Sequence, residues 1–337
     1  MLPTLSVLIP AKNEEKVIDK CLDSLLNSDY PEDKLEILVN VNGSSDNTYE
    51  ICKKYKRVKT IKTLAKKNRG EALNELIPMT RGEIVGIFDA DTFVEKDCLK
   101  QAVNRFSDQT VMGVSGLVKS IKNSLVSKSL SIEKLNNSLI EYIISYELGH
   151  NSHFVGKNMF IRKKIFEEIG HLNTNVWLDD VEISQRMKKY KHKVVFEPKA
   201  VTWEKEPETL KAFFNQRKTW AKSVFKLKKV GIRSRKDWIY DLMHYAGYYF
   251  VPVVTLLLSA LFVLYFLNYP IQTLAILTSV VFLSGLSFML FSRIVYNEPF
   301  SDLMYLPVMF FLHNVHVVLI AVAFVNEQIE KIFKRQN

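Results

Sequence analysis

The stretch Glu83-Ile84-Val85-Gly86-Ile87-Phe88-Asp89-Ala90-Asp91 decides the fold class of this sequence. Its first six residues predict a buried β-strand, because an apolar run with β-branched residues follows a break at Arg81-Gly82. Two carboxylates, Asp89 and Asp91, stand where that strand ends, and ligands of open α/β sheets bind at strand ends. Such a pair can hold Mg²⁺ or Mn²⁺, which in turn bridge phosphate oxygens, although aspartates are also common in solvated turns.

Predicted strands and helices alternate on both sides of this stretch. Apolar runs of strand length lie at 5–9, 35–39, 58–61, 111–118 and 153–161, and helical spacing covers 14–26, 46–55, 70–77, 96–106, 126–146 and 182–190. This alternation predicts an α/β fold with a mostly parallel sheet flanked by helices. The chain contains neither Gly-x-Gly-x-x-Gly nor Gly-x-x-x-x-Gly-Lys-Ser/Thr, which argues against a dinucleotide-binding or P-loop protein.

The 337 residues divide into two parts of different composition. Residues 1–235 mix polar and apolar side chains, whereas residues 240–337 contain long stretches without Asp, Glu, Lys or Arg. The second part has room for about three hydrophobic spans, near 245–268, 271–292 and 303–326. We therefore expect C-terminal transmembrane helices and a multi-pass membrane protein.

The formal net charge of +10 is concentrated just before the first of these spans. That position fits an anionic lipid surface and the positive-inside rule better than nucleic acid, which we do not expect as a partner. A helix near 211–229 interleaves aromatic and basic residues, a pattern of helices in a membrane interface and also of ordinary core helices. The N-terminus lacks the features of a signal peptide, so we expect the first part on the cytoplasmic face.

The ordered motifs of the first part resemble those of membrane-attached family 2 glycosyltransferases with a GT-A catalytic domain. The resemblance covers most of residues 5–225, in the stretches 7–15 with its Pro-x-x-Asn-Glu, 42–48, 89–91 with its Asp-x-Asp, 156–162, 178–186 and 216–220. Each stretch alone is common, but their order and spacing together are specific.

The resemblance implies a role for each matching residue. Asp91, with Asp89, would hold the metal, and Asp180 would be the catalytic base that accepts the proton of the attacking hydroxyl. Contacts to the nucleotide-sugar donor are implied for Pro10, Asn13, Glu14, Asn42, Asp89, Gln216 and Arg217, and contacts to the acceptor for Trp220 and Asp179. Two simpler interpretations stay open, because Asp179-Asp180 also suits a helix N-terminus and Trp220 also suits a membrane anchor.

The sequence departs from the family pattern at three positions. Val41 replaces the first aspartate of the nucleotide loop, which leaves recognition of the base to Asn40 or Asn42. Thr219 replaces the arginine of Gln-x-x-Arg-Trp, and Glu71 stands where the family has a lysine. These departures put the identity of the base and the strength of the diphosphate clamp in doubt.

We therefore expect an inverting, metal-dependent transfer of a sugar from a UDP- or GDP-sugar, with Mg²⁺ or Mn²⁺ as cofactor. The acceptor would be a lipid-linked sugar or another glycan acceptor, at a membrane whose lipids contact the protein. One alternative is a processive polysaccharide synthase, which would need more spans to form a channel. The other is a non-catalytic membrane protein that retains the fold.

Overall fold

The computed structural model describes residues 2–63, 68–147, 149, 151–176, 178–229, 272–316, 318, 319, 322 and 326. The chain divides into two compact units. The first comprises Met1–Lys119, Glu141–Lys205 and Lys226–Ser234, and the second comprises Ser120–Ile140, Glu206–Phe225 and Arg235–Asn337.

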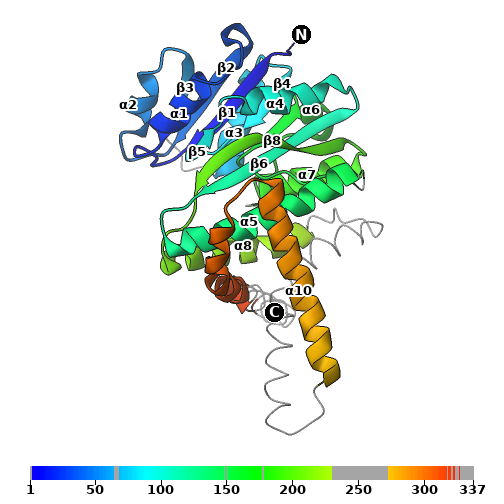
Figure 1. Cartoon of the computed structure of the whole chain (residues 1–337). Coiled ribbons are helices and arrows are strands. Elements are labelled where there is room, and N and C mark those ends of the chain that lie inside the picture. Colours follow the sequence, from blue (N-terminus) through cyan, green and yellow to red (C-terminus); the bar gives the residue numbers. More distant parts are fainter. Residues whose placement is uncertain are drawn as a thin grey trace, which may run out of the picture. The chain divides into compact units, whose positions relative to one another are not determined.

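An eight-stranded sheet with the order β3-β2-β1-β4-β7-β6-β8-β5 organises the first unit (Figure 1). Its strands are β1 (Leu5–Ala11), β2 (Leu35–Asn42), β3 (Val58–Thr63), β4 (Ile84–Ile87), β5 (Thr92–Val94), β6 (Val111–Ile121), β7 (Met159–Arg162) and β8 (Lys193–Lys205). Strands β3, β2, β1 and β4 are parallel, whereas β4–β7, β6–β7 and β5–β8 pair antiparallel. The predicted α/β fold is confirmed, with the parallel strands gathered in one half of the sheet.

Helices cover both faces of this sheet. One face packs against α1 (Ile18–Leu26), α2 (Thr48–Lys53) and α4 (Cys98–Asn104), and the other against α3 (Arg69–Leu76), α6 (Lys164–Ile169) and α7 (Asp179–Lys189). Successive strand residues point to opposite faces, so Val7 joins the first core and Leu8 the second. Both faces are therefore apolar, which explains why the strand segments of the sequence are mostly apolar instead of alternating.

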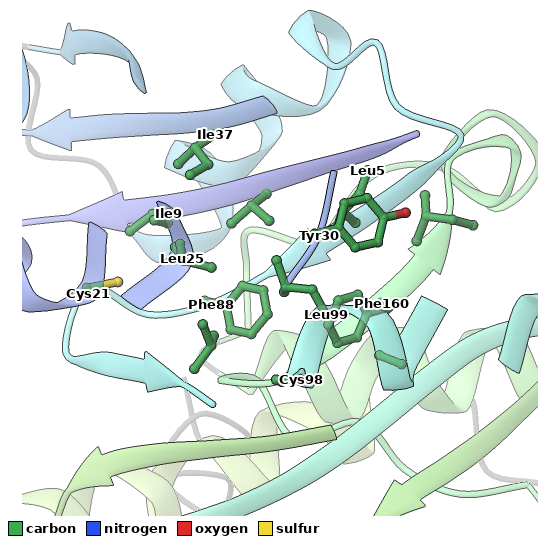
Figure 2. Packing of buried hydrophobic residues seen from close by; sticks show 14 of the residues in the cluster. Leu5, Ile9, Cys21, Leu25, Tyr30, Ile37, Phe88, Cys98, Leu99 and Phe160 are labelled. Carbon is green, nitrogen blue, oxygen red and sulfur yellow. The ribbon is translucent and has the colours of Figure 1, made fainter. Parts of the chain in front are cut away.

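Figure 2 shows the core on the α1 and α4 face, where Leu5 and Ile9 of β1 lie against side chains from those helices. The rings of Phe88 and Phe160 meet edge to face with their centroids 5.5 Å apart. Such a pair adds about 0.5–1.5 kcal/mol to the burial of its rings. Because Phe88 directly precedes Asp89, this packing anchors the backbone that carries the two aspartates.

The second unit is helical in its described part. It contains most of α5 (Leu125–Tyr142), α8 (Leu210–Lys229), α10 (Gln272–Val295), η6 (Phe300–Tyr305) and the helical residues 306–316. An apolar cluster joins three of these helices through Val126, Leu130, Phe213 and Leu312. The helix predicted near 211–229 is thus present as α8. The remaining short elements are η1 (Glu32–Lys34), η2 (Ile77–Met79), η3 (Arg105–Ser107) and the π-helical η4 (Ile143–Glu147).

The predicted membrane spans find no support in the described part of the chain. Span 245–268 lies outside the described residues, 271–292 corresponds to α10, and 303–326 corresponds to η6, the helical residues 306–316 and a few residues beyond them. Within the part of the chain that the structure describes, no helix combines the length and the apolar composition needed to cross a membrane.

Four elements differ from the sequence prediction. The strand expected at 153–161 begins only at Met159, because the peptide groups of Gly156 bind Asp180 and Arg69 instead of a neighbouring strand. The short strand β5 and helix α6 were not expected. Strand β8 was not expected either. Its apolar run is interrupted by Glu197 and Pro198, so its sequence does not predict a strand.

Candidate active site

The parallel strands β1, β2 and β4 end at one edge of the sheet, and their carboxyl ends position the candidate site. Asp89 and Asp91 follow β4 and are both partly exposed, with 25% and 30% of their side chains accessible. Asp89 accepts a hydrogen bond of 2.8 Å from Nε of Arg69. Burial alone would raise the pKa of Asp89, but the charges of Arg69 and Lys157 lower it below its usual value. Asp89 is therefore held as a carboxylate.

Arg69 links this carboxylate to the start of α7. Its Nη1 lies 2.6 Å from Oδ2 of Asp179, and its Nη2 donates to the carbonyl of Gly156. The arginine is the first residue of α3, whose N-terminus is fixed by a capping box: Asn68 accepts from the amide of Glu71, and Glu71 accepts from the amide of Asn68. Arg69 is thus fixed at both ends and holds Asp89 and Asp179 in one network.

Asp180, the predicted base, lies in the first turn of α7 and is half-buried. Its Oδ2 accepts from the amide of Gly156 at 2.9 Å, and its Oδ1 accepts from the amide of Val181 at 2.8 Å. Burial, and next the neighbouring Asp179 carboxylate, raise the pKa of Asp180 to about 6. A carboxylate with this pKa can accept a proton near neutral pH, as a general base must.

Lys157 lies in the loop that precedes β7, and its ammonium group is the second positive charge near the aspartates. Its Nζ lies 3.4 Å from both carboxylate oxygens of Asp91, 3.9 Å from Oδ2 of Asp89 and 2.7 Å from Oε2 of Glu204. Glu204 belongs to β8 and pairs in register with Thr92, the residue after Asp91. The sequence prediction missed Arg69, Lys157 and Glu204 as parts of the site.

The residues present can accommodate a divalent cation. Among the contacts that the described residues show, two cations, Arg69 and Lys157, face a larger group of carboxylates, which are Glu14, Asp89, Asp91, Asp179, Asp180 and Glu204. The described residues contain no group of three or more His, Cys, Asp or Glu side chains arranged to hold a metal. Mg²⁺ commonly takes one or two carboxylates and completes its coordination with water and substrate phosphates. The pair Asp89 and Asp91 fits that mode.

The loop after β1, which contains the predicted donor contacts Asn13 and Glu14, is bonded to the loop after β2. Asn13 adopts a positive φ of 57°, its amide donates to Oγ of Ser44, and its Oδ1 accepts from the amide of Ser45. The amide of Glu14 donates to Oγ1 of Thr48 at 2.8 Å. Burial, and then the Asp91 and Asp89 carboxylates, raise the pKa of Glu14 to about 7. Glu14 therefore lies within electrostatic reach of the aspartate pair.

The structure also bears on the position where Val41 replaces an aspartate. Val41 is fully buried in the α1 and α2 core. Asn40 is buried on the other face, where its Nδ2 donates to the carbonyl of Ala72 and to Glu75 and its Oδ1 accepts from Thr63. The side chain of Asn40 is thus engaged within the fold, and Asn42, the last residue of β2, is also buried. Pro10, also predicted to face the donor, pairs with Asn40 in the sheet.

The predicted residues of α8 belong to the second unit, where they form a cluster with neighbouring helices. Arg217 is buried, its Nη2 donates to Oε2 of Glu133 at 3.1 Å, and its guanidinium lies 4.4 Å from the ring centroid of Trp220. Glu133 also approaches Nδ1 of His313 at 3.8 Å. Oε1 of Gln216 is buried without a hydrogen-bond partner. The charge of Arg217 is therefore balanced within its own unit.

Comparison with known proteins assigns the domain to a family. Residues 6–170 match Glycosyl transferase family 2. The probable glycosyltransferase YdaM of Bacillus subtilis is 32% identical over 284 residues, which cover 78% of this chain and 66% of that protein. A beta-monoglucosyldiacylglycerol synthase of Trichormus variabilis is 31% identical over 230 residues, which cover 65% of this chain and 48% of that protein. The chain thus spans between about half and two thirds of the length of these curated relatives.

A solved structure supports the same assignment at the level of the fold. The mannosyltransferase PcManGT from Pyrobaculum calidifontis, in complex with GDP-Man and Mn²⁺, aligns with a TM-score of 0.61 and 20% identity over 94% of this chain and 87% of its own. Residues 6–170 therefore form a glycosyl transferase family 2 domain with a GT-A fold, the domain of a glycosyltransferase.

Proposed function

We propose that this glycosyltransferase moves a sugar from a nucleoside diphosphate donor to an acceptor hydroxyl with inversion at the anomeric carbon. One observation carries the proposal. The candidate base Asp180 is connected to Asp89 through Gly156 and Arg69 at the carboxyl edge of the sheet. Asp91, two residues after Asp89, lies 3.4 Å from Lys157, which neighbours Gly156. A proton acceptor and a candidate metal-diphosphate site thus belong to one rigid network.

The residues divide the chemistry between them. The acceptor oxygen forms a bond to the anomeric carbon, its proton passes to Oδ of Asp180, and the bond to the diphosphate breaks with its electrons staying on the phosphate oxygen. Mg²⁺ or Mn²⁺, held by Asp91 with Asp89, would supply Lewis-acid stabilisation of that leaving group. Asn13, Glu14 and Asn42 line the donor side, and Arg69 keeps Asp89 and Asp179 in place. The GT-A fold can accommodate such a donor and metal, since PcManGT was solved with both.

For the acceptor, we favour a lipid or lipid-linked sugar at a membrane surface. One relative is named for a synthase of a glucosyl lipid. The second unit also exposes large apolar side chains, in the described part of the chain Leu125, Leu210, Phe214, Leu283, Phe291, Ile294, Phe300, Met304, Phe311, Val318 and Val322. Isolated exposed apolar residues are normal, but a concentration of them in one unit suits a lipid surface. Attachment to a membrane, with the catalytic domain on the cytoplasmic face, is part of this proposal.

A transfer assay tests the proposed activity. The purified chain is incubated with Mn²⁺, a panel of UDP- and GDP-sugars, and diacylglycerol or polyisoprenyl phosphate acceptors in mixed micelles. We expect a product with one added sugar, and none from Asp91→Asn, because a neutral amide is a poor ligand for a hard cation. The same change at exposed Asp33 of η1 is the control and should retain activity.

The products separate this proposal from its alternatives. A ladder of long products would identify a processive synthase instead of a single-transfer enzyme. The absence of both donor hydrolysis and transfer, in a protein that folds, would favour a non-catalytic membrane protein that retains the fold.

A further inference from the structure

Lys157 is the one cation that contacts both aspartates of the candidate metal pair among the described residues of the site. It differs from Arg69 in how it is held. Arg69 makes short, directional bonds to two carboxylates, whereas Lys157 lies 2.7 Å from Glu204 and 3.4 Å or more from the aspartates. Its side chain is 27% exposed. Lys157 can therefore turn toward a ligand without breaking a bidentate bond.

The backbone that carries Lys157 is fixed by its two neighbours. Asn158 is fully buried, and its Nδ2 donates to the carbonyls of Leu117 and Ala200. Gly156 is held between the carboxylate of Asp180 and the guanidinium of Arg69. The backbone of this loop is therefore held firmly, and its lysine points toward the aspartates. The same tripeptide positions Asp180, the candidate catalytic base.

The anchor of the ammonium group is equally well defined. Glu204 has only 9% of its side chain accessible and comes from β8, which pairs with β5 directly after Asp91. Because the register of this pairing is fixed, Glu204 holds the ammonium group beside Asp91.

We propose that Lys157 is a catalytic residue whose ammonium group contacts the diphosphate of the donor and stabilises it as it leaves. This inference rests on the proposed function. A diphosphate bridged to Asp91 through a cation lies within a few ångströms of that carboxylate, and so within reach of the four-carbon side chain of Lys157. As the bond between the anomeric carbon and oxygen breaks, its electrons stay on the phosphate oxygen, and Lys157 donates hydrogen bonds to the diphosphate without giving up its proton. The acceptor proton still goes to Asp180.

The position of Lys157 beside the aspartates predicts that it helps catalysis but weakens binding of the metal ion. Without donor, the ammonium group lies beside the carboxylates that would hold the cation and repels it. Removal of the positive charge should therefore strengthen Mn²⁺ binding to the donor-free protein while it weakens catalysis. A residue that merely supports the fold would weaken both or change neither.

The test compares Lys157→Gln with the wild type and with Lys164→Gln, the same change at an exposed lysine of α6. Mn²⁺ binding is measured on the donor-free protein by electron paramagnetic resonance, and kcat and KM are measured with saturating metal. For Lys157→Gln we expect kcat to fall by about 10²- to 10³-fold, and Mn²⁺ to bind up to about tenfold more tightly. Lys157→Arg, which keeps the charge, should recover part of kcat.

Each outcome decides between explanations. An unchanged kcat in Lys157→Gln, with an active wild type, overturns the role of Lys157 and leaves the proposed function standing. A wild type that binds Mn²⁺ but turns over no donor overturns the proposed function itself. If Lys157→Gln fails to fold, Glu204→Gln replaces it: the lysine keeps its charge but loses its anchor, so kcat should fall less, and an unchanged kcat there counts against the inference.

Discussion

Asp89 and Asp180 carry the same side chain, but their surroundings shift their pKa values in opposite directions. Two cations, Arg69 and Lys157, overcome the effect of burial at Asp89 and lower its pKa. At Asp180, burial and the Asp179 carboxylate outweigh the charge of Arg69 and raise the pKa to about 6. Titratable groups whose environments separate their pKa values are typical of acid–base assignments. Asp89, which stays ionised, suits binding of a cation, and Asp180, which titrates near neutrality, suits proton transfer.

Turnover should therefore follow the ionisation of Asp180. The base must be unprotonated to act, so kcat should fall as the pH drops through about 6 and stay level above it. Asp180→Asn keeps the size of the side chain but removes the proton acceptor, and kcat should fall by about 10²- to 10⁴-fold. The measurements are a pH profile of kcat and the affinity for the donor nucleotide. Nucleotide affinity that drops as much as turnover would make Asp180 a structural residue.

The buried position of Val41 leads to a prediction about the base of the donor. With Val41 in the core and Asn40 bonded to Ala72 and Glu75, Asn42 is the side chain left to read the base at the end of β2. A site with few hydrogen bonds to the base discriminates weakly, so UDP and GDP should inhibit within about an order of magnitude of each other. Inhibition constants for the two nucleotides provide the test. Strong selectivity that survives Asn42→Ala would mean that another element reads the base.

At the scale of the elements, the contact between the loop at Gly156 and the first turn of α7 sets the position of the base. A Cβ at Gly156 would lie 3.0 Å from Oδ2 of Asp180, so Gly156→Ala should push the carboxylate away and lower kcat by about tenfold or more. At Gly70, in α3, the added Cβ would meet its nearest atom at an ordinary 3.5 Å, so Gly70→Ala is the matched control. Both variants should melt close to the wild type. Equal kcat in the two variants would show that Asp180 tolerates the shift.

Elements with strong local patterns could be predicted from the sequence, and elements defined by distant partners could not. The strands β1, β2 and β4 are mostly apolar runs, because helices bury both of their faces. β8 pairs with β5 from more than a hundred residues away and carries a proline in its run, so its own residues do not reveal it. Local periodicity carries no information about a partner strand.

The same limit applies to the site. Asp89, Asp91 and Asp180 stand in short motifs, and the structure brings them into one network at the edge of the sheet. Their cationic partners come from other segments: Arg69 is 110 residues from Asp179, and Lys157 is 66 residues from Asp91. No spacing along the chain relates these residues, so only the fold shows that they meet. Gln216, Arg217 and Trp220 were predicted with them but lie in the second unit.

At the scale of the whole molecule, the two units use charge differently. The first gathers an excess of carboxylates at a partly exposed edge, whereas the second buries matched pairs such as Arg217 with Glu133. Loss of one partner from a buried pair leaves an uncompensated charge and usually costs about 3–5 kcal/mol. The charges of the first unit therefore suit ligand binding, and those of the second unit stabilise its helices.

The exposed apolar side chains of the second unit predict binding to lipid. Phe300 and Met304 of η6 are 54% and 72% exposed, and each side chain gains about 1.5–3 kcal/mol when it leaves water completely. Partial insertion of both should still contribute more than tenfold to affinity, so Phe300→Ser with Met304→Ser should reduce flotation with anionic vesicles. Tyr190→Ser, at a 51% exposed residue of the first unit, is the control and should float like the wild type. If the double variant floats equally well, η6 does not contact the membrane, and the proposed lipid surface must lie elsewhere.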